Sequence, residues 1–355
     1  MGSLRLFLAL AVALSHFKIP LEMPTSDVAV QCFFVVSGFY MALVLNEKYP
    51  PGSYWLFISN RVLRLWPTYL MVLVASFGVA RNWWPIASLD FISIAYFLVS
   101  QIFVVGQESY FFLFADHDAL RFSLHAADTP TILFKFSPVP QAWTLALEIY
   151  FYLVAPFIVR RGPLVVGAAI VASILLRLTL LWGFDFGRDP WTCRFFPSEL
   201  ALFLAGSLGY YASASRGEAE RKRANAGRLL LIIPLLAGLA CSEWNGISRL
   251  MSLTILGAVI IGIPRLFELT RNIAWDRYLG ELSYPLYICH FLVGWITLPE
   301  TVASAYGSLA LSLVVSMAFY RWVECPIDHW RQSRFERTRQ ATNRALLLKA
   351  VSSST

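Results

Sequence analysis

The chain has 355 residues, of which 57% are hydrophobic and only 14% are charged. This balance excludes an ordinary soluble domain and indicates a polytopic membrane protein. The net charge of +7 does not indicate nucleic acid as a partner, because the basic residues gather in short segments between apolar runs. The five cysteines have no paired spacing of a zinc or redox motif, so we assign them no chemistry. We expect no metal site and no permanently bound cofactor.

The apolar segments predict an all-α fold, a polytopic transmembrane bundle of ten to eleven helices. Several segments are shorter than the ~20 residues of a simple span, which favours a bundle with tilted or broken helices. In chain order they lie at residues 4–18, 28–45, 65–80, 86–105, 142–159, 164–182, 195–211, 228–242, 250–267, 282–298 and 303–320.

Arginine-rich segments predict which ends of the helices face the cytoplasm. Residues 216–228 and the chain after Tyr320 are both basic, so both are expected on that side. The number of spans counted forward from the N-terminus and the number counted back from the C-terminal basic segments differ by one crossing. We therefore expect one segment between 65 and 159 to be re-entrant or non-spanning, with both termini cytoplasmic and residues 106–140 on the outer face.

The chain divides into two predicted parts. Residues 1–326 form a single transmembrane domain, and residues 327–355 form a basic cytoplasmic tail without regular structure. The first segment also has features of a signal peptide, with Arg5 before a short apolar run. We treat it as retained, because the segments after it still require a multi-pass fold.

His16 lies in the first apolar segment, eleven residues after Arg5. Eleven helical steps of about 100° bring the two side chains to the same face, roughly 16 Å apart along the axis. This spacing predicts a cation at the cytoplasmic rim and an imidazole near mid-membrane, where ionisable groups are costly and usually functional.

Arg61 and Arg64 lie one helical turn apart, just before Pro67. Two forked, permanently charged donors at that position suit phosphate groups. The alternative is simple anchoring of the helix on the positive side of the membrane.

Glu148 lies within an aromatic, apolar helix and shares a face with Tyr152. A carboxylate there requires a partner, and we predict that it orients His16 as a general base. The alternative is a structural ion pair between Glu148 and an arginine of another helix.

Ser283, Tyr287 and His290 follow a spacing of four and three residues and line one face of a late helix. His290 is a second candidate for acid–base chemistry or acceptor binding, or else a structural hydrogen-bond donor between helices. Earlier in the chain, Ser37 and Gly38 place two small residues in a bulky helix, for which close packing is the first explanation and a substrate tunnel the second.

Together these motifs resemble the integral-membrane acyltransferase family 3, from Arg5 to Pro326. The resemblance lies in their order and spacing, since each motif alone is common. The matching residues are Arg5 and His16, Phe33 to Phe39, Arg61 with Arg64 and Pro67, Trp143 with Leu145 and Glu148, Phe151 with Tyr152, Ser283 to His290, and Glu324 with Pro326.

The resemblance implies transfer of an acyl group, commonly acetyl, from acyl-CoA on the cytoplasmic side to a hydroxyl of a cell-envelope or exported carbohydrate. The expected location is the cytoplasmic (inner) membrane, and proteins of polysaccharide assembly are possible partners. We expect His16, Glu148 and His290 to be catalytic, and Arg5, Arg61 and Arg64 to bind the donor. Residues expected to contact substrate are Trp143, Tyr152, Ser283 and Tyr287.

Two alternatives remain open at this point. One is a transporter or flippase for a lipid-linked saccharide that performs no covalent chemistry, which inverted repeats would favour. The other is a catalytically idle scaffold for polysaccharide assembly. Within the acyltransferase hypothesis, a transient acyl-histidine would use the same atoms as a general base.

Overall fold

The computed structural model describes residues 1–21, 24–184, 186, 189–213 and 246–352. The predicted helix at 228–242 and the basic segment at 216–228 lie outside the described residues. Elsewhere each predicted apolar segment is helical. The helices are α1 (Gly2–His16), α2 (Ser26–Glu47), α3 (Tyr54–Val79), α4 (Phe91–Phe103), α5 (Trp143–Ile158), α6 (Pro163–Phe184), α7 (Phe196–Ser213), α10 (Gly246–Thr270), α11 (Ala274–Thr297), α12 (Val302–Phe319) and α13 (Cys325–Ser352).

Six helical segments of the described chain are long and apolar enough to cross a membrane. This supports a multi-pass membrane protein, whereas the number of ten to eleven spans stays a prediction. The six segments are Ser26–Glu47, Tyr54–Val79, Pro140–Arg161, Pro163–Phe184, Leu253–Thr270 and Val302–Thr338.

Helix ends follow local chemistry. The α1 helix ends at His16 because Lys18 has a positive φ of 53° and Pro20 disfavours helix in the residue before it. The α2 helix begins where Thr25 accepts a hydrogen bond from the Val28 amide. His16 is thus the last residue of α1 and is exposed. Its depth in a membrane stays a prediction.

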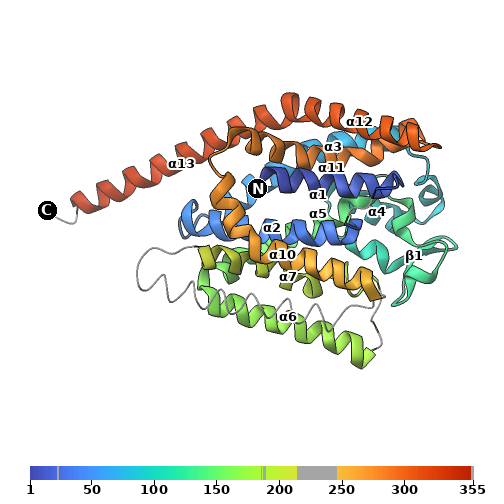
Figure 1. Cartoon of the computed structure of the whole chain (residues 1–355), viewed down its shortest axis with the longest axis horizontal. Helices are drawn as coiled ribbons and strands as arrows, with labels where there is room; N and C mark the ends of the chain where they lie inside the picture. Colours follow the sequence, from blue (N-terminus) through green and yellow to red (C-terminus); the bar gives the residue numbers. More distant parts are fainter. Residues whose placement is uncertain (22–23, 185, 187–188, 214–245, 353–355) are drawn as a thin grey trace.

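The helices run side by side, with two distinct ends (Figure 1). At one end, here called the basic end, lie the start of α1 and the beginning of α13. At the other, the hairpin end, lies an antiparallel pair of strands, β1 (Leu113–Asp116) and β2 (Ala119–Phe122). This hairpin departs from a purely all-α fold, and it belongs to the connection predicted for the outer face.

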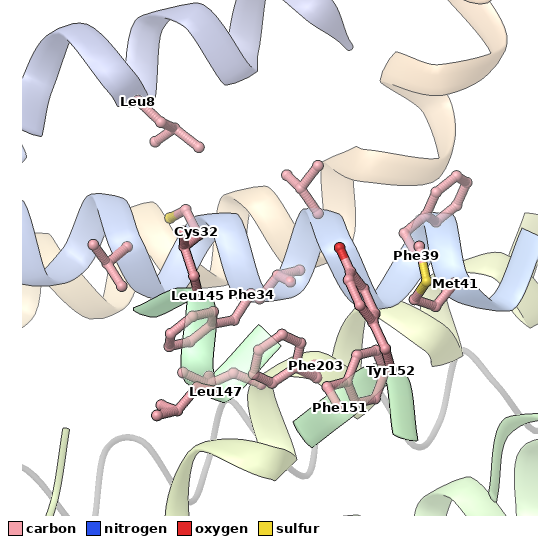
Figure 2. Close-up of a cluster of buried hydrophobic side chains, with 14 of the residues drawn as sticks. Leu8, Cys32, Phe34, Phe39, Met41, Leu145, Leu147, Phe151, Tyr152 and Phe203 are labelled. Atoms are coloured by element: carbon pink, nitrogen blue, oxygen red, sulfur yellow. The ribbon is translucent and has the colours of Figure 1, made fainter. Parts of the chain in front are cut away.

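Aromatic stacking joins the central helices of the bundle (Figure 2). The ring of Phe203 on α7 lies 4.5 Å from that of Phe34 on α2 and 4.5 Å from that of Phe151 on α5. All three side chains are buried, so α2, α5 and α7 share one core. Offset ring pairs of this kind add to the free energy gained by burial alone.

Glycines bring α2 and α7 into backbone contact. A Cβ atom at Gly38 would lie 1.7 Å from the Phe203 carbonyl oxygen, and one at Gly206 would lie 1.8 Å from that of Val35. No side chain fits at either position. Gly38 therefore serves close packing, as its small size predicted, while the neighbouring Ser37 faces a cavity described below.

Two elements bear on the predicted topology. The α4 helix has 13 residues and is ~20 Å long, shorter than a ~30 Å hydrocarbon core, which makes it the candidate for the non-spanning segment. The chain after Glu324 continues as α13, where we expected a tail without regular structure. Packing explains the difference, because the buried ring of Phe335 lies 5.1 Å from that of Tyr49 and Arg331 donates to the Asn60 carbonyl.

Candidate active site

A cavity of about 440 Å³ opens between α1, α2, α3, α5, α10 and α11; it is called the main cavity below. The structure brings Arg5, Arg61 and Arg64 together in its wall, although they come from two helices distant in sequence. Further cationic side chains that sequence reasoning did not assign to the site also line the cavity: Lys48, Arg271, Arg277 and Arg331.

The predicted arginine pair is held loosely. Arg64 forms an ion pair with Glu281 at 3.6 Å, and both side chains are partly exposed. The guanidinium of Arg61 lies 5.9 Å from the ring centre of Tyr152, and no described residue accepts a hydrogen bond from its buried Nε. Both arginines therefore retain donors for an anion.

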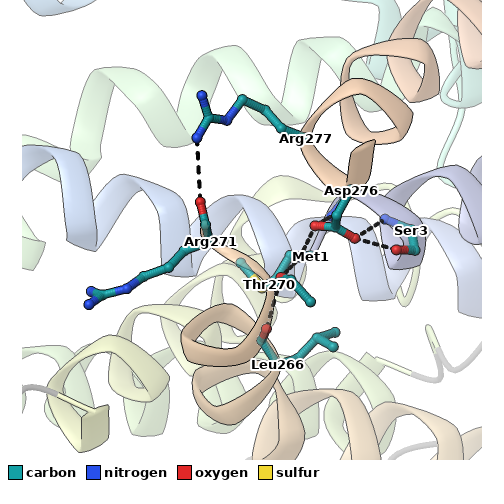
Figure 3. A network of polar contacts seen from close by, with 8 residues as sticks. Met1, Ser3, Leu266, Thr270, Arg271, Asp276 and Arg277 are labelled. Carbon is teal, nitrogen blue, oxygen red and sulfur yellow. Dashed lines mark hydrogen bonds and ion pairs between the residues drawn. The ribbon is translucent and has the colours of Figure 1, made fainter. Parts of the chain in front are cut away.

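The start of α1 is anchored at the mouth of the main cavity (Figure 3). The buried carboxylate of Asp276 accepts hydrogen bonds from the amides of Gly2 at 2.7 Å and Ser3 at 2.9 Å, and it pairs with the Met1 ammonium at 2.6 Å. A carboxylate at a helix N-terminus satisfies amides that have no partner within the helix. Asp276 therefore fixes the position of α1, and with it the position of Arg5.

Glu148 lies inside the main cavity, at the centre of one helix face. Thr144, Glu148 and Tyr152 are spaced by four residues on α5, and all three line the cavity. The Glu148 carboxylate accepts hydrogen bonds from the hydroxyl of Ser37, at 2.9 Å, and from the hydroxyl of Tyr152. Hydroxyls rather than an arginine or an imidazole thus solvate this carboxylate.

The main cavity extends to a hydroxyl pair, Tyr287 and Thr144, whose oxygens lie 2.8 Å apart. Gln141 connects this pair to α11, because its side-chain amide donates to the Ile288 carbonyl at 2.7 Å. The lining of the cavity on α11 therefore reaches Tyr287, one helical turn before His290. Of the other residues predicted to contact substrate, Tyr152 and Ser283 line the cavity, and Ser283 also donates to the Gly280 carbonyl.

That next turn carries His290, which is fully buried and pairs with His16. Nδ1 of His16 lies 2.9 Å from Nε2 of His290, and Nδ1 of His290 lies 2.7 Å from the Tyr287 carbonyl oxygen. The α1 and α11 helices run in the same direction, so Arg5 lies near Gly280 at one end of the contact and His16 meets His290 at the other. Arg5 and His16 accordingly share a helix face, as predicted.

These distances fix the protons of the neutral pair. A carbonyl only accepts, so Nδ1 of His290 donates to Tyr287 and leaves its Nε2 as an acceptor. Nδ1 of His16 must then donate to His290. The lone pair of His16 is consequently on Nε2, the atom that no other described residue contacts through a hydrogen bond, and this is the arrangement of an oriented base or nucleophile.

This pairing corrects the predicted contact between Glu148 and His16. His290, not Glu148, is the hydrogen-bond partner of His16. The reason is geometric, since Glu148 points into the main cavity beyond the Tyr287–Thr144 pair, whereas His16 is at the hairpin end of α1.

Trp143 does not line the main cavity, and its ring is covered by Arg194. The Arg194 guanidinium carbon lies 4.4 Å from the ring centre of Trp143 and 4.1 Å from that of Phe111, while its Nε donates to Asp189 at 2.7 Å. Sequence reasoning missed Arg194. Its only signal is an arginine among aromatic residues, which a loop next to a membrane helix often contains.

The fold and the cavity together define a multi-pass helical membrane protein with a deep cationic site. Residues 2–321 match the family model described as "Acyltransferase domain". The chain therefore belongs to acyltransferase family 3, and it is a membrane acyltransferase.

One relative gives further context. The chain is 25% identical over 201 residues to an uncharacterized protein of Aquifex aeolicus (strain VF5), a match that covers 54% of this chain and 89% of the relative. No solved structure matches the chain.

Proposed function

We propose that this protein transfers an acyl group, most simply acetyl, from acyl-CoA on the cytoplasmic side of the inner membrane to a hydroxyl of a cell-envelope or exported carbohydrate. The observation that carries the proposal is the path of the main cavity. It leads from a cluster of arginines at the basic end to Tyr287, one helical turn from His290 and the paired His16.

The positive charge of the arginines at the basic end of the main cavity supports an anionic donor. Arg5, Arg61 and Arg64 offer forked donors that suit the phosphates of acyl-CoA. A donor held there by its phosphates can extend its thioester arm along α5 and α11 toward Tyr287. The basic end would then face the cytoplasm, in agreement with the basic residues after Tyr320.

The proton chemistry follows from the histidine pair. Nε2 of His16 takes the proton of the acceptor hydroxyl as its oxygen attacks the thioester carbonyl. The carbon–sulfur bond breaks, and the CoA thiolate recovers the proton from the His16 imidazolium. His290 stabilises that imidazolium by accepting from its Nδ1, so His290 is a positioning residue in this scheme.

The exposed position of His16 supports an acceptor from the hairpin end. The imidazole lies at the end of α1, so a large saccharide reaches it without entering the bundle. The donor would arrive from the basic end, and the two substrates would meet at the Tyr287 turn. Carbohydrate modification therefore fits the separation of the two ends.

The test uses purified protein in lipid nanodiscs with radiolabelled acetyl-CoA and glycans extracted from cells that lack the gene. We expect label transfer and CoA release by the unaltered chain and loss of both in His16→Gln. Label transfer by a correctly inserted His16→Gln variant at the unaltered rate would overturn the proposal. Movement of a saccharide across the bilayer without any dependence on CoA would instead favour a flippase.

A further inference from the structure

A second cavity, of about 260 Å³, lies beside the main cavity at the basic end; it is called the side cavity below. It is enclosed by α3, the first two turns of α11, the turn at Tyr320–Glu324 and the start of α13. That turn has π-helical hydrogen bonding. Single π turns within helices are rare and are frequent at functional sites.

The two cavities share a wall that is rich in arginine. Arg64, Arg277, Glu281 and Arg331 line both of them. Arg64 and Glu281 are held only by a partly exposed ion pair at 3.6 Å, a type of contact worth ~1 kcal/mol or less. An incoming anion can therefore displace Glu281 from Arg64 at low cost.

The interior of the side cavity has a different chemistry from its wall. Two tyrosines, Tyr278 and Tyr320, meet edge to face there with ring centres 5.5 Å apart. Glu324 and Asp328 add carboxylates, and Gln332 adds an amide. Aromatic faces with acceptor oxygens suit a flat base with an exocyclic amine.

From this juxtaposition we propose that the side cavity binds the nucleoside of the acyl donor. The diphosphate of the donor then crosses the shared arginine wall, and its pantetheine arm occupies the main cavity and points toward Tyr287. The ribose of CoA also carries a 3′-phosphate, and this phosphate then lies at the same arginine wall, so that the adenine occupies the aromatic interior of the side cavity. The inference rests on the proposed function, in which acyl-CoA is the donor.

The test compares two donors that share the acetylated pantetheine arm. Acetyl-CoA carries the 3′-phosphoadenosine end with its diphosphate, and acetyl-phosphopantetheine carries a single phosphate in their place. Ala274 lines only the side cavity and is exposed, so Ala274→Trp fills the cavity without disturbing the core. Tyr278→Ala removes one aromatic face without filling anything.

We expect Ala274→Trp and Tyr278→Ala to raise the KM for acetyl-CoA roughly 5- to 50-fold, the effect of losing one base-stacking contact. The KM for acetyl-phosphopantetheine should not change. Matched controls are Ala303→Trp and Tyr306→Ala, exposed positions on α12 that line neither cavity. Both controls should retain the kinetics of the unaltered chain with both donors.

A binding measurement without turnover separates this inference from the proposed function. Calorimetry with 3′,5′-ADP should show binding to the unaltered chain and loss of binding in Ala274→Trp. Equal changes in KM for the two donors, or unchanged binding of 3′,5′-ADP in the variant, would overturn the side-cavity assignment and leave acyl transfer intact. Absence of transfer from either donor would overturn the proposed function, while the binding result would still decide the assignment.

Discussion

His290 accepts a hydrogen bond from His16 across 2.9 Å, although 274 positions separate the two residues in sequence. The Tyr287 carbonyl holds the other nitrogen of His290 at 2.7 Å. The carbonyl thereby determines which nitrogen of His16 is available for chemistry. The backbone of α11 thus determines the tautomer of His16 at the end of α1.

These two hydrogen bonds, from His16 to His290 and from His290 to the Tyr287 carbonyl, are called the relay below. The relay predicts different kinetics for variants of the two histidines. His16→Gln should lower kcat for acyl transfer by roughly 10²- to 10⁴-fold, the usual contribution of a general base. His290→Ala should cost roughly 10- to 100-fold, as for loss of an orienting partner, because the His16 base is still present. In a plot of rate against pH, His290→Ala should keep the acidic limb, where the rate rises as His16 loses its proton, and His16→Gln should lack it. Equal losses in the two variants with the same pH profile would contradict the relay.

Glu148 should affect the donor rather than the proton transfer. It lies in the main cavity and accepts from Ser37 and Tyr152. Glu148→Gln removes a negative charge close to where the phosphates and the thioester arm are proposed to lie, so we expect a KM for acetyl-CoA changed by roughly 2- to 10-fold. The dependence of kcat on pH should match that of the unaltered chain. A shifted pH profile would contradict this prediction and favour the direct contact between Glu148 and His16 that the sequence suggested.

The contact between α2 and α7 should not tolerate a single added methyl group. In Gly206→Ala the Cβ would lie 1.8 Å from the Val35 carbonyl oxygen, so the two helices must separate. We expect a loss of ~1–3 kcal/mol in the free energy of unfolding, or failure to accumulate in the membrane. Gly307→Ala on α12 is the matched control, since its Cβ would meet nothing within 4 Å. Thermal unfolding in detergent that gave the same midpoint for both variants would rule out this packing.

Glu108, at the hairpin end, predicts a dependence of stability on pH. Burial raises the pKa of its carboxyl, against the opposing hydrogen bond from the Tyr150 hydroxyl at 2.8 Å. The fold therefore favours the protonated form. Its contribution to stability is complete below the unfolded pKa of about 4.3 and is lost as pH rises through the higher folded pKa.

The variant Glu108→Gln keeps the hydrogen bond and cannot ionise. Its unfolding midpoint should therefore exceed that of the unaltered chain near pH 8, and the two should converge near pH 4. Glu300→Gln, at an exposed position, provides the control and should leave the curve unchanged. Parallel curves for the unaltered chain and Glu108→Gln from pH 4 to pH 8 would show that burial of this carboxyl has no such effect.

Local patterns predicted much of this molecule. Apolar runs located the helices, because hydropathy is a local property. They missed the more polar beginnings of α3 at Tyr54 and α11 at Ala274, which lie well before the predicted segments 65–80 and 282–298. The spacing of Arg61 and Arg64 likewise placed them on one face, and the structure places both in the main cavity. The family resemblance added the order of motifs from Arg5 to Pro326.

Contacts between helices could not be predicted in the same way. His16 contacts His290 and not Glu148 because of how α1, α5 and α11 are arranged. Residue spacing within one helix does not contain that information. The same limit applies to Arg194, whose partners Phe111 and Trp143 lie on other segments. The side cavity likewise needs α13, a helix that the basic composition of residues 327–355 did not suggest.

The continuous helical segment Val302–Thr338 has a consequence for the depth of the site in a membrane. Its 37 residues are ~55 Å long, and even a tilt of ~40° leaves a rise of ~42 Å against a hydrocarbon thickness of ~30 Å. At least the charged final turns must therefore stand among lipid headgroups or in water. Arg331 lies in that part and also borders both cavities. A soluble nucleotide can thus reach the arginine wall from the aqueous phase without crossing acyl chains.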